Sequence, residues 1–476
     1  MNRRTFHRTV LGAAAFGAVT GEATAQKPPR YEPNWFSLSN HKLPEWFKDA
    51  KLGIFIHWGL YSVPAWAPPT GELGKVNWNE WFKKNPYAEW YLNTLRIQGS
   101  PTYEHHVKTY GENFDYYEFS KAFNEGVAKW DPNNWASLFK RTGARYVVLT
   151  TKHHDGFTLW PSRVPNPKRP GQRISSSRDL VGDLTSAVRA QSMKMGLYYS
   201  GGLDWTFTSE PITNVAELMA RVPQSEEYAQ YADAHWRELI ERYQPIVMWN
   251  DISYPKKGKL EQIFSEYYNS VPDGVINNRF SVEVSDFTTP EYAKYDNITE
   301  KKWESCRGLG FSFGYNQLEG PEQVMAPDKL IALLVDITSK NGNLLLNIGP
   351  KSDGSISDIQ MDRLNKLGEW LAVNGEGIFG SRPWVRPGTK AGDGTDLRFT
   401  RKGDSVYAFF LDKPKSNDLV IPGVLSVEGM KAEVLGHNAQ AAWKQNGRDL
   451  VVTAQGSLPG QFAVKLTPAP YQAVRD

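Results

Sequence analysis

Between residues 45 and 380 the sequence repeats one pattern, in which an amphipathic helix precedes a short and almost wholly apolar run. Such helix-then-strand units occupy residues 134–151, 180–200, 226–249 and 328–346. Strands that are apolar along their whole length are typical of parallel sheets covered by helices on both faces. The number of units favours a barrel over a shorter open sheet. We therefore predict an α/β fold over residues 26–383, an irregular (β/α)8 TIM-like barrel.

After residue 383 the pattern changes to short segments in which apolar and polar residues alternate, with turn residues between them. These segments lie at residues 397–399, 405–411, 419–421 and 450–453. Alternation with a period of two is typical of antiparallel strands that bury one face. The sequence therefore predicts a small C-terminal antiparallel β-sandwich over residues 384–476.

The first 25 residues have the features of an export signal. Paired arginines at positions 3–4 precede an apolar run over residues 10–19, which is too short to span a bilayer, and small residues at 23–25 offer a cleavage site. The arginine pair resembles a bacterial twin-arginine (Tat) signal. We predict a Tat-like signal peptide over residues 1–25 and a periplasmic or secreted mature protein without a membrane anchor.

The composition argues against several classes of protein. The 55 Lys and Arg residues nearly balance 52 Asp and Glu residues, and the formal charge of +3 over 476 residues is too weak for a nucleic-acid binder. A hydrophobic content of 40% with 22% charged residues excludes a multispan membrane protein and a disordered chain. Cys306 is the only cysteine, so neither an intrachain disulfide nor a Cys-based zinc site can form.

Aromatic residues make up 13% of the chain, and many of them stand beside polar residues where predicted strands end. These clusters lie at residues 55–59, 89–91, 153–157, 198–200 and 249–251. Barrel proteins place their chemistry at the carboxyl ends of the strands. Flat aromatic faces with polar edges suit a sugar ring as well as they suit a core. The clusters favour a sugar-binding site, and core burial remains the default explanation for most other aromatics.

Two carboxylates that flank a glycosidic bond about 5 Å apart are the minimum apparatus for retaining hydrolysis. Asp251 follows the apolar run 246–249, so it falls at the end of a predicted barrel strand, although a strand-end Asp can also cap a loop. For the second carboxylate, spacing alone does not choose among Glu283, Glu291 and Glu304.

Three histidines, His57, His153 and His154, could instead bind a metal ion. If the strand continues through His153 and His154, their side chains point to opposite faces, unlike the pairs that chelate a metal. Hydrogen bonds to sugar hydroxyls are therefore favoured over metal ligation, with a structural histidine as a further alternative. We predict no metal ion and no cofactor, and a metal-dependent hydrolase remains a competing hypothesis.

Taken together, these motifs resemble glycoside hydrolase family 29, the α-L-fucosidases. The resemblance extends from about Pro44 to Pro383. Its six ordered motifs lie at residues 53–59, 152–157, 198–205, 249–251, 312–316 and 343–350. The resemblance implies a retaining exo-hydrolase on an irregular barrel with a C-terminal β-sandwich. It also implies Asp251 as the nucleophile, ionised at rest, and Glu291 as the acid/base, protonated at rest, in the exported bacterial branch with the broader substrate range.

The resemblance further implies a sugar pocket and a fucosylated oligosaccharide or glycoconjugate as the substrate. The pocket residues would be His57, Glu89, Trp90, His153, His154, Tyr198 and Arg279. Phe55 and Phe313 would surround the C6 methyl group, since an apolar wall there rejects the extra hydroxyl of galactose. A non-catalytic fucose-binding protein on a degenerate hydrolase scaffold is the alternative function. The sequence leaves open whether the chain forms a homo-oligomer.

Overall fold

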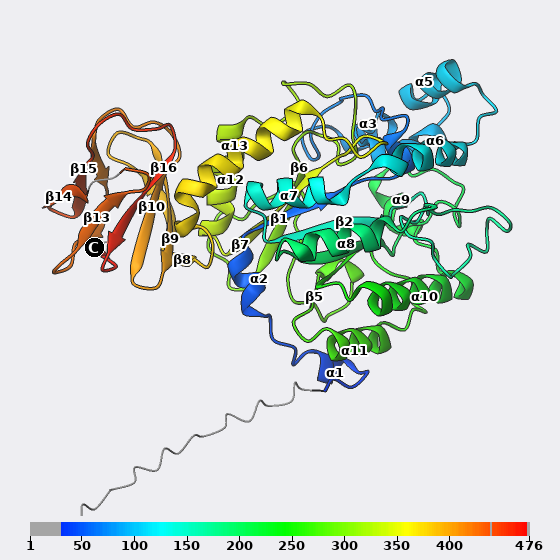
Figure 1. The fold of residues 1–476 in the computed structure, drawn as a ribbon, viewed down its shortest axis with the longest axis horizontal. Helices are drawn as coiled ribbons and strands as arrows, with labels where there is room; N and C mark the ends of the chain where they lie inside the picture. Colours follow the sequence, from blue (N-terminus) through cyan, green and yellow to red (C-terminus); the bar gives the residue numbers. More distant parts are fainter. Residues whose placement is uncertain (1–29, 438–439, 474–476) are drawn as a thin grey trace, which may run out of the picture. The chain divides into compact units, whose positions relative to one another are not determined.

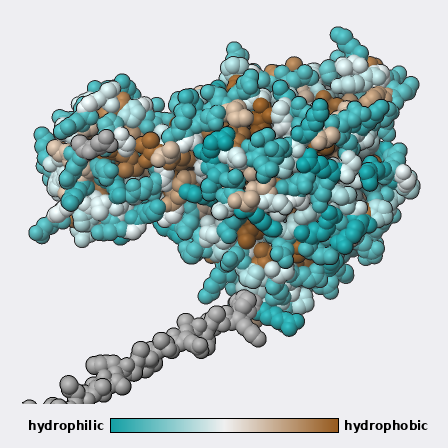
Figure 2. All heavy atoms as spheres, in the orientation of Figure 1, coloured by the Kyte–Doolittle hydropathy of each residue, from teal (hydrophilic) through white to brown (hydrophobic). Residues whose placement is uncertain are grey.

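The computed structural model describes residues 30–437 and 440–473 (Figure 1). Parallel strands and helices alternate in the first part of the chain, and antiparallel strands follow from Arg382. The export signal predicted over residues 1–25 lies outside the described residues. In the described ranges, no helix is both long enough and apolar enough to cross a membrane. Hydrophilic residues cover most of the face that Figure 2 shows, with hydrophobic residues in small patches between them.

Seven parallel strands form the first sheet, in the order β5-β4-β3-β2-β1-β7-β6. They are β1 Leu52–Ile56, β2 Tyr146–Lys152, β3 Lys194–Ser200, β4 Val247–Asp251, β5 Val275–Ile276, β6 Trp303–Gly308 and β7 Gly342–Ile348. Six of them are buried almost throughout, which matches the apolar runs of the sequence and confirms the predicted parallel α/β sheet.

The eighth strand of the predicted barrel does not form as a regular strand among the described residues, and β5 and β6 remain the edges of the sheet. Between them, the Pro/Thr-containing segment 287–291 makes only isolated parallel bridges. Phe287 bridges to Asn277 after β5, whereas Thr288 and Glu291 bridge to β6. Pro290 has no N–H to donate, which limits a regular ladder here. The sheet is therefore open, with an irregular segment along its gap.

Six longer helices accompany the sheet, and four of them, α7, α8, α10 and α11, lie along its outside in Figure 1. The six are α7 Pro132–Thr142, α8 Leu180–Ala190, α10 Glu226–Tyr243, α11 Leu260–Ser270, α12 Pro327–Ser339 and α13 Asp358–Asn374. Local sequence sets their ends: α7 has Asp131 as N-cap, Pro132 in its first turn and Gly143 in the left-handed conformation at its C-terminus. Ser225 caps α10 in the same way.

Shorter helices fill the connections that surround the carboxyl ends of the strands. They are α3 Trp78–Lys83, α4 Tyr91–Leu95, α5 Pro101–Tyr110 and α6 Phe119–Gly126 between β1 and β2, and α9 Val215–Ala220 after β3. Two more, α1 Trp35–Leu38 and α2 Glu45–Ala50, precede β1. Because a loop that follows a parallel strand begins at its carboxyl end, α3 to α6 and α9 are built onto the edge where barrel proteins place their sites.

The C-terminal strands form an eight-stranded antiparallel sheet, in the order β11-β15-β14-β13-β16-β10-β9-β8. They are β8 Arg382–Lys390, β9 Asp396–Lys402, β10 Ser405–Phe410, β11 Asp418–Ile421, β13 Lys431–Val434, β14 Gln440–Asn446, β15 Asp449–Thr453 and β16 Phe462–Thr467, with β12 Val424–Leu425 pairing β17 Tyr471–Gln472. Phe399 of β9 and Ile421 of β11 share one hydrophobic core although their strands are far apart in the sheet order. The sheet therefore folds over itself, as expected for a sandwich.

Candidate functional site

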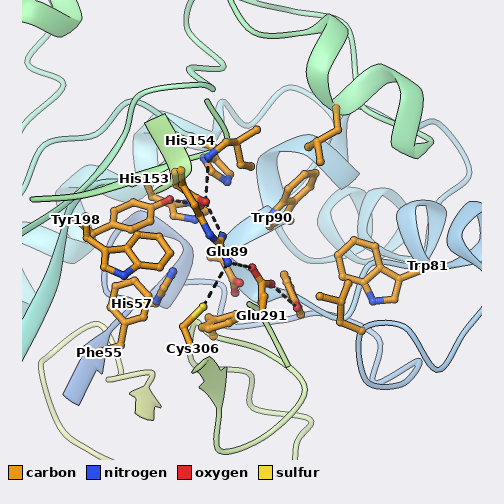
Figure 3. A pocket seen from close by; sticks show the side chains of 18 of the residues that line it. Phe55, His57, Trp81, Glu89, Trp90, His153, His154, Tyr198, Glu291 and Cys306 are labelled. Atoms are coloured by element: carbon orange, nitrogen blue, oxygen red, sulfur yellow. Dashed lines mark hydrogen bonds and ion pairs between the residues drawn. The ribbon is translucent and has the colours of Figure 1, made fainter. Parts of the chain in front are cut away.

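A cavity of about 190 Å³ opens at the carboxyl ends of the parallel strands (Figure 3). All the residues that the sequence predicted for the site line it: Phe55, His57, Glu89, Trp90, His153, His154, Tyr198, Asp251, Arg279, Glu291 and Phe313. Nine further residues, which are not among those that the sequence predicted for the site, also line it: Leu73, Trp78, Trp81, Phe82, Tyr87, Leu218, Trp249, Ile252 and Cys306. The predicted residues thus lie together around one cavity, and most of the additional lining residues have aromatic or aliphatic side chains.

The guanidinium of Arg279 joins the two carboxylates of the site. Its Nη1 donates to Asp251 Oδ1 at 2.8 Å, and its Nη2 donates to Glu291 Oε2 at 3.0 Å. Arg279 lies in the single 3₁₀ turn Asn278–Phe280, and its Nε donates to Thr289 Oγ1 at 3.0 Å. The guanidinium also lies over the ring of Trp249, 4.7 Å from its centroid. These contacts fix the charge between Asp251 and Glu291.

Asp251 is the last residue of β4, and its backbone position depends on a glycine in the neighbouring connection. Gly202 donates its backbone N–H to the Asp251 carbonyl at 3.0 Å. A Cβ atom at position 202 would lie 1.4 Å from the carbonyl oxygen of Ile252, so no other residue fits there without moving the backbone. Tyr198 donates its hydroxyl to Asp251 Oδ2 at 2.8 Å.

The electrostatics around Asp251 favour its ionised form. Burial acts to raise the pKa of Asp251, but the charge of Arg279 and the hydrogen bonds from Arg279 and Tyr198 outweigh it, so the pKa lies below its ordinary value. With both oxygens accepting hydrogen bonds, Asp251 is held as a carboxylate in a fixed orientation.

Glu291 lies in the irregular segment beside β6, and its pKa is shifted in the opposite direction to that of Asp251. Burial raises the pKa of Glu291, the charge of Arg279 opposes this, and the charge of Asp251 adds to it, with a raised pKa as the result. Tyr87 donates its hydroxyl to Glu291 Oε1 at 3.1 Å. The site therefore holds two neighbouring carboxyl groups whose pKa values are driven apart.

The two other candidates for the second carboxylate lie elsewhere. Glu283 is exposed and does not line the cavity. Glu304 is buried beneath the cavity, where it accepts hydrogen bonds from Trp249 Nε1 at 2.9 Å and from the Tyr146 hydroxyl. Burial raises the pKa of Glu304 to about 7. Of the three glutamates, the structure places only Glu291 beside Asp251.

Residues in the left-handed conformation follow both carboxylates. Ile252, directly after Asp251, has φ 50°, and Ser253 has φ 72°. Tyr292, directly after Glu291, has φ 47°. A β-branched residue such as Ile252 adopts this conformation only under constraint from its surroundings. The chain thus turns sharply at both points, immediately after presenting the carboxylate to the cavity.

The condition under which His153 and His154 would point to opposite faces, a strand that continues through both, is not met, because β2 ends at Lys152. Both side chains line the cavity, with ring centroids 4.0 Å apart. Ser200 Oγ donates to the carbonyl of Leu203 at 2.6 Å, so it accepts from His154 Nδ1, also at 2.6 Å. Nε2 of His154 is therefore the acceptor of the ring.

His57 has the same tautomer for a similar reason. Asn347 donates its amide to the carbonyl of Phe313 at 2.6 Å, so its Oδ1 accepts from His57 Nδ1 at 2.7 Å. Burial lowers the pKa of His57 to about 4 and that of His154 to about 3. Both imidazoles are neutral near pH 7, and each offers Nε2 as an acceptor for a hydroxyl group.

Glu89 and Trp90 lie on the single turn Ala88–Trp90 that precedes α4. Glu89 Oε2 accepts from the backbone N–H of Gly314 at 2.7 Å, and burial raises the pKa of Glu89 to about 7. Trp90 packs edge-on against His154, with ring centroids 5.5 Å apart. These contacts place a hydrogen-bonding carboxyl group and an aromatic ring beside the histidines.

The described residues contain no group of three or more His, Cys, Asp or Glu side chains arranged to hold a metal ion. The arrangement provides an ionised carboxylate, a carboxyl group with a raised pKa, neutral imidazole acceptors and aromatic walls. Such a set can support nucleophilic attack together with proton transfer on a small polyhydroxylated ring.

Comparisons with known proteins agree with this chemistry. A family model described as "Alpha-L-fucosidase" matches residues 18–376. The tissue α-L-fucosidase of Homo sapiens is 33% identical over 474 residues, which span 95% of this chain and 95% of that protein. A solved structure of Thermotoga maritima α-fucosidase in complex with fucose is 45% identical, with a TM-score of 0.84 over 92% of this chain and 100% of that one.

The substitution Arg279→Gln tests the ion pairs. Near pH 7 it leaves the buried carboxylate of Asp251 and the partly buried carboxyl group of Glu291 without their counter-charge, and we expect a loss of about 3–5 kcal/mol in the free energy of unfolding. Because the pKa of Asp251 is lowered in the folded state, its contribution is present above the unfolded pKa of about 3.9 and is lost as the pH falls through the folded pKa.

The loss of unfolding free energy in Arg279→Gln, relative to the wild type, should therefore be smaller at about pH 3.5 than near pH 7. Urea unfolding at the two pH values measures it. Arg237→Gln, which removes an exposed ion pair with Glu266, is the matched control and should change little at either pH. A deficit of the same size at both pH values would show that Arg279 acts through packing alone.

Proposed function

We infer, because this chain belongs to the α-L-fucosidase family and is a glycoside hydrolase, that its cavity hydrolyses terminal α-L-fucosyl residues of fucosylated glycans with retention of configuration. The observation that carries this proposal is the pair of carboxyl groups joined by Arg279, one with a lowered and one with a raised pKa. Retaining glycosidases need one carboxylate that attacks and one carboxylic acid that donates a proton.

In the first step, Asp251 attacks the anomeric carbon while Glu291 gives its proton to the glycosidic oxygen. The bond between these two sugar atoms breaks, the leaving group departs as an alcohol, and a fucosyl ester of Asp251 forms. Tyr198 and Arg279 hold the Asp251 carboxylate in its orientation.

In the second step, Glu291 removes a proton from a water molecule, which attacks the same anomeric carbon and releases Asp251. The charge of Asp251 is one cause of the raised pKa of Glu291. When Asp251 is esterified this charge is gone, so the pKa of Glu291 falls and the group can act as a base. One carboxyl group thus serves as acid and then as base.

The walls of the cavity suit a 6-deoxy sugar. Phe55 and Phe313 lie 6.4 Å apart between ring centroids and offer an apolar surface for a methyl group. The neutral imidazoles of His57 and His154 and the carboxyl group of Glu89 are hydrogen-bonding partners for ring hydroxyls. The related Thermotoga maritima enzyme, solved in complex with fucose, supports this assignment of the ligand.

No specific observation favours the alternative, a non-catalytic fucose-binding protein. Such a protein would not need two carboxyl groups that are bound to the same guanidinium and have pKa values shifted in opposite directions. Buried charges are costly to keep, so the retained pair supports an enzyme.

We also propose that the chain is an exported bacterial protein of the branch with the broader substrate range. The support is the twin-arginine pattern of residues 1–25 and the resemblance of its motifs. Amino-terminal sequencing of the protein from a periplasmic fraction should find a mature chain that begins near Gln26, and a chain that retains the paired arginines would contradict export by this route.

The activity and the nucleophile can be tested together with an aryl α-L-fucoside. The wild-type protein should release the aryl alcohol, and Asp251→Gly should lower kcat by at least about 10³-fold, because no other group can form the ester. Added azide should restore turnover in Asp251→Gly and give a fucosyl azide of inverted configuration. Asp296→Asn, an exposed control outside the cavity, should behave as wild type. Failure of the wild type to release any aryl alcohol between about pH 4 and pH 8 would refute the proposed activity.

If Glu291 is the acid, the loss of rate on its removal should depend on the leaving group of the substrate. In Glu291→Ala, cleavage of a fucoside with an activated aryl group should fall much less in the first step than cleavage of an alkyl fucoside, which needs protonation. Pre-steady-state kinetics on both substrates measure the two losses. Glu283→Ala, an exposed glutamate outside the cavity, is the control. Equal losses for the two substrates would assign the acid to another residue.

A further inference from the structure

One wall of the cavity consists only of apolar residues and has no role in the proposed chemistry. Its members are Leu73, Trp78, Trp81, Phe82 and Leu218. Every charged residue of the lining, namely Asp251, Arg279, Glu89 and Glu291, lies outside this group, and so do the three histidines. We refer to these five apolar residues as the apolar wall.

Ring contacts connect the apolar wall to Glu291. Tyr87 donates to Glu291, and the ring of Tyr87 packs edge-on against Trp81 with centroids 4.9 Å apart. Trp81 in turn packs against Trp78 at 5.9 Å. In Figure 3, Trp81 lies on the opposite side of Glu291 from Phe55 and His57. The wall therefore continues the cavity outward past Glu291, away from the residues assigned to the sugar.

The outer part of this region exposes apolar surface. Trp78, which lines the cavity, is 44% exposed. Apolar surface left open beside a cavity is typical of a binding site. Continuity with the cavity identifies its occupant as the remainder of the substrate.

The wall also holds one unsatisfied hydrogen-bond donor. Trp81 is 3% exposed, and its Nε1 is buried without a partner. A buried indole N–H without an acceptor is unfavourable, and a ligand oxygen that accepts from it relieves that cost. Together, the wall offers flat apolar area and a single buried, unpaired donor, with no charged group.

We propose that the apolar wall is the leaving-group subsite, and that it selects fucosides whose leaving group presents a flat apolar face with an acceptor oxygen at its edge. Two sources have this chemistry, an aryl ring and the C–H face of a pyranose. The inference rests on the proposed function, because Glu291 protonates the glycosidic oxygen and the leaving group must then lie on the side of Glu291 that faces away from the fucosyl residue. A wall with one buried, unpaired donor recognises shape and apolar area more than the arrangement of hydroxyl groups.

Trp78→Ala tests the subsite because this side chain is partly exposed and packs against Trp81 and Phe82, away from the two carboxyl groups. Three substrates separate the effects: 4-methylumbelliferyl α-L-fucoside, α-L-fucosyl-(1→2)-galactose and α-L-fucosyl fluoride, which has no aglycone. We expect kcat/KM to fall about tenfold for a substrate whose leaving group packs on Trp78, and less than about twofold for the fluoride. Trp78→Phe should recover most of the loss, and Phe36→Ala, an exposed aromatic residue away from the cavity, is the control.

A fall with the aryl fucoside and the disaccharide shows that the subsite accepts both sources, and a fall with only one of them assigns the subsite to that source. An equal fall for the fluoride, or no fall for either of the other two substrates, would overturn the proposal. If the wild type turns over none of the three, the proposed hydrolase function fails, which is distinct from failure of the subsite.

Discussion

The site depends on one largely buried guanidinium. Removing a charged group from water is costly unless it is paired and hydrogen-bonded, and Arg279 is paired with Asp251 and Glu291 at once. These three residues come from β4, from a single 3₁₀ turn and from the irregular segment beside β6. None of the three segments could move independently without breaking an ion pair. The charge of Arg279 therefore adds to the isolated backbone bridges that connect these segments at the edges of the sheet.

Below the ion pairs, a second polar group supports the floor of the cavity. Trp249 lies under the guanidinium and donates its indole N–H to the buried Glu304. Glu304 also accepts from Tyr146 of β2, so it connects β2, β4 and β6 inside the sheet. A fully hydrogen-bonded buried group of this kind specifies one arrangement of its neighbours. The flat ring that faces the guanidinium is thereby fixed from below.

Local patterns predicted the regular elements and the strand-end residue Asp251, because apolar periodicity and capping residues act over short distances. The unit predicted at residues 180–200 contains α8 and β3 in the structure, and the unit at 226–249 contains α10 and the first residues of β4. Glu291 could not be chosen on the same basis, since its position depends on bridges to β6 across a gap in the sheet. The orientation of His153 and His154 followed from the end of β2, which the sequence does not mark. Likewise, Trp81 and Tyr87 join the cavity only through tertiary packing.

The left-handed residues that follow the two carboxylates have a thermodynamic consequence. Ile252 and Tyr292 occupy a conformation that costs of the order of 1 kcal/mol or more for non-glycine residues, and the surrounding structure must supply that energy. This cost lowers the free energy of unfolding of the protein relative to a chain with unstrained residues at these two turns. Selection for stability alone would favour glycine or asparagine at both positions. Ile252 and Tyr292 stand there instead, and their side chains are used: Ile252 lines the cavity, and Tyr292 donates its hydroxyl to the Gly310 carbonyl at 3.0 Å.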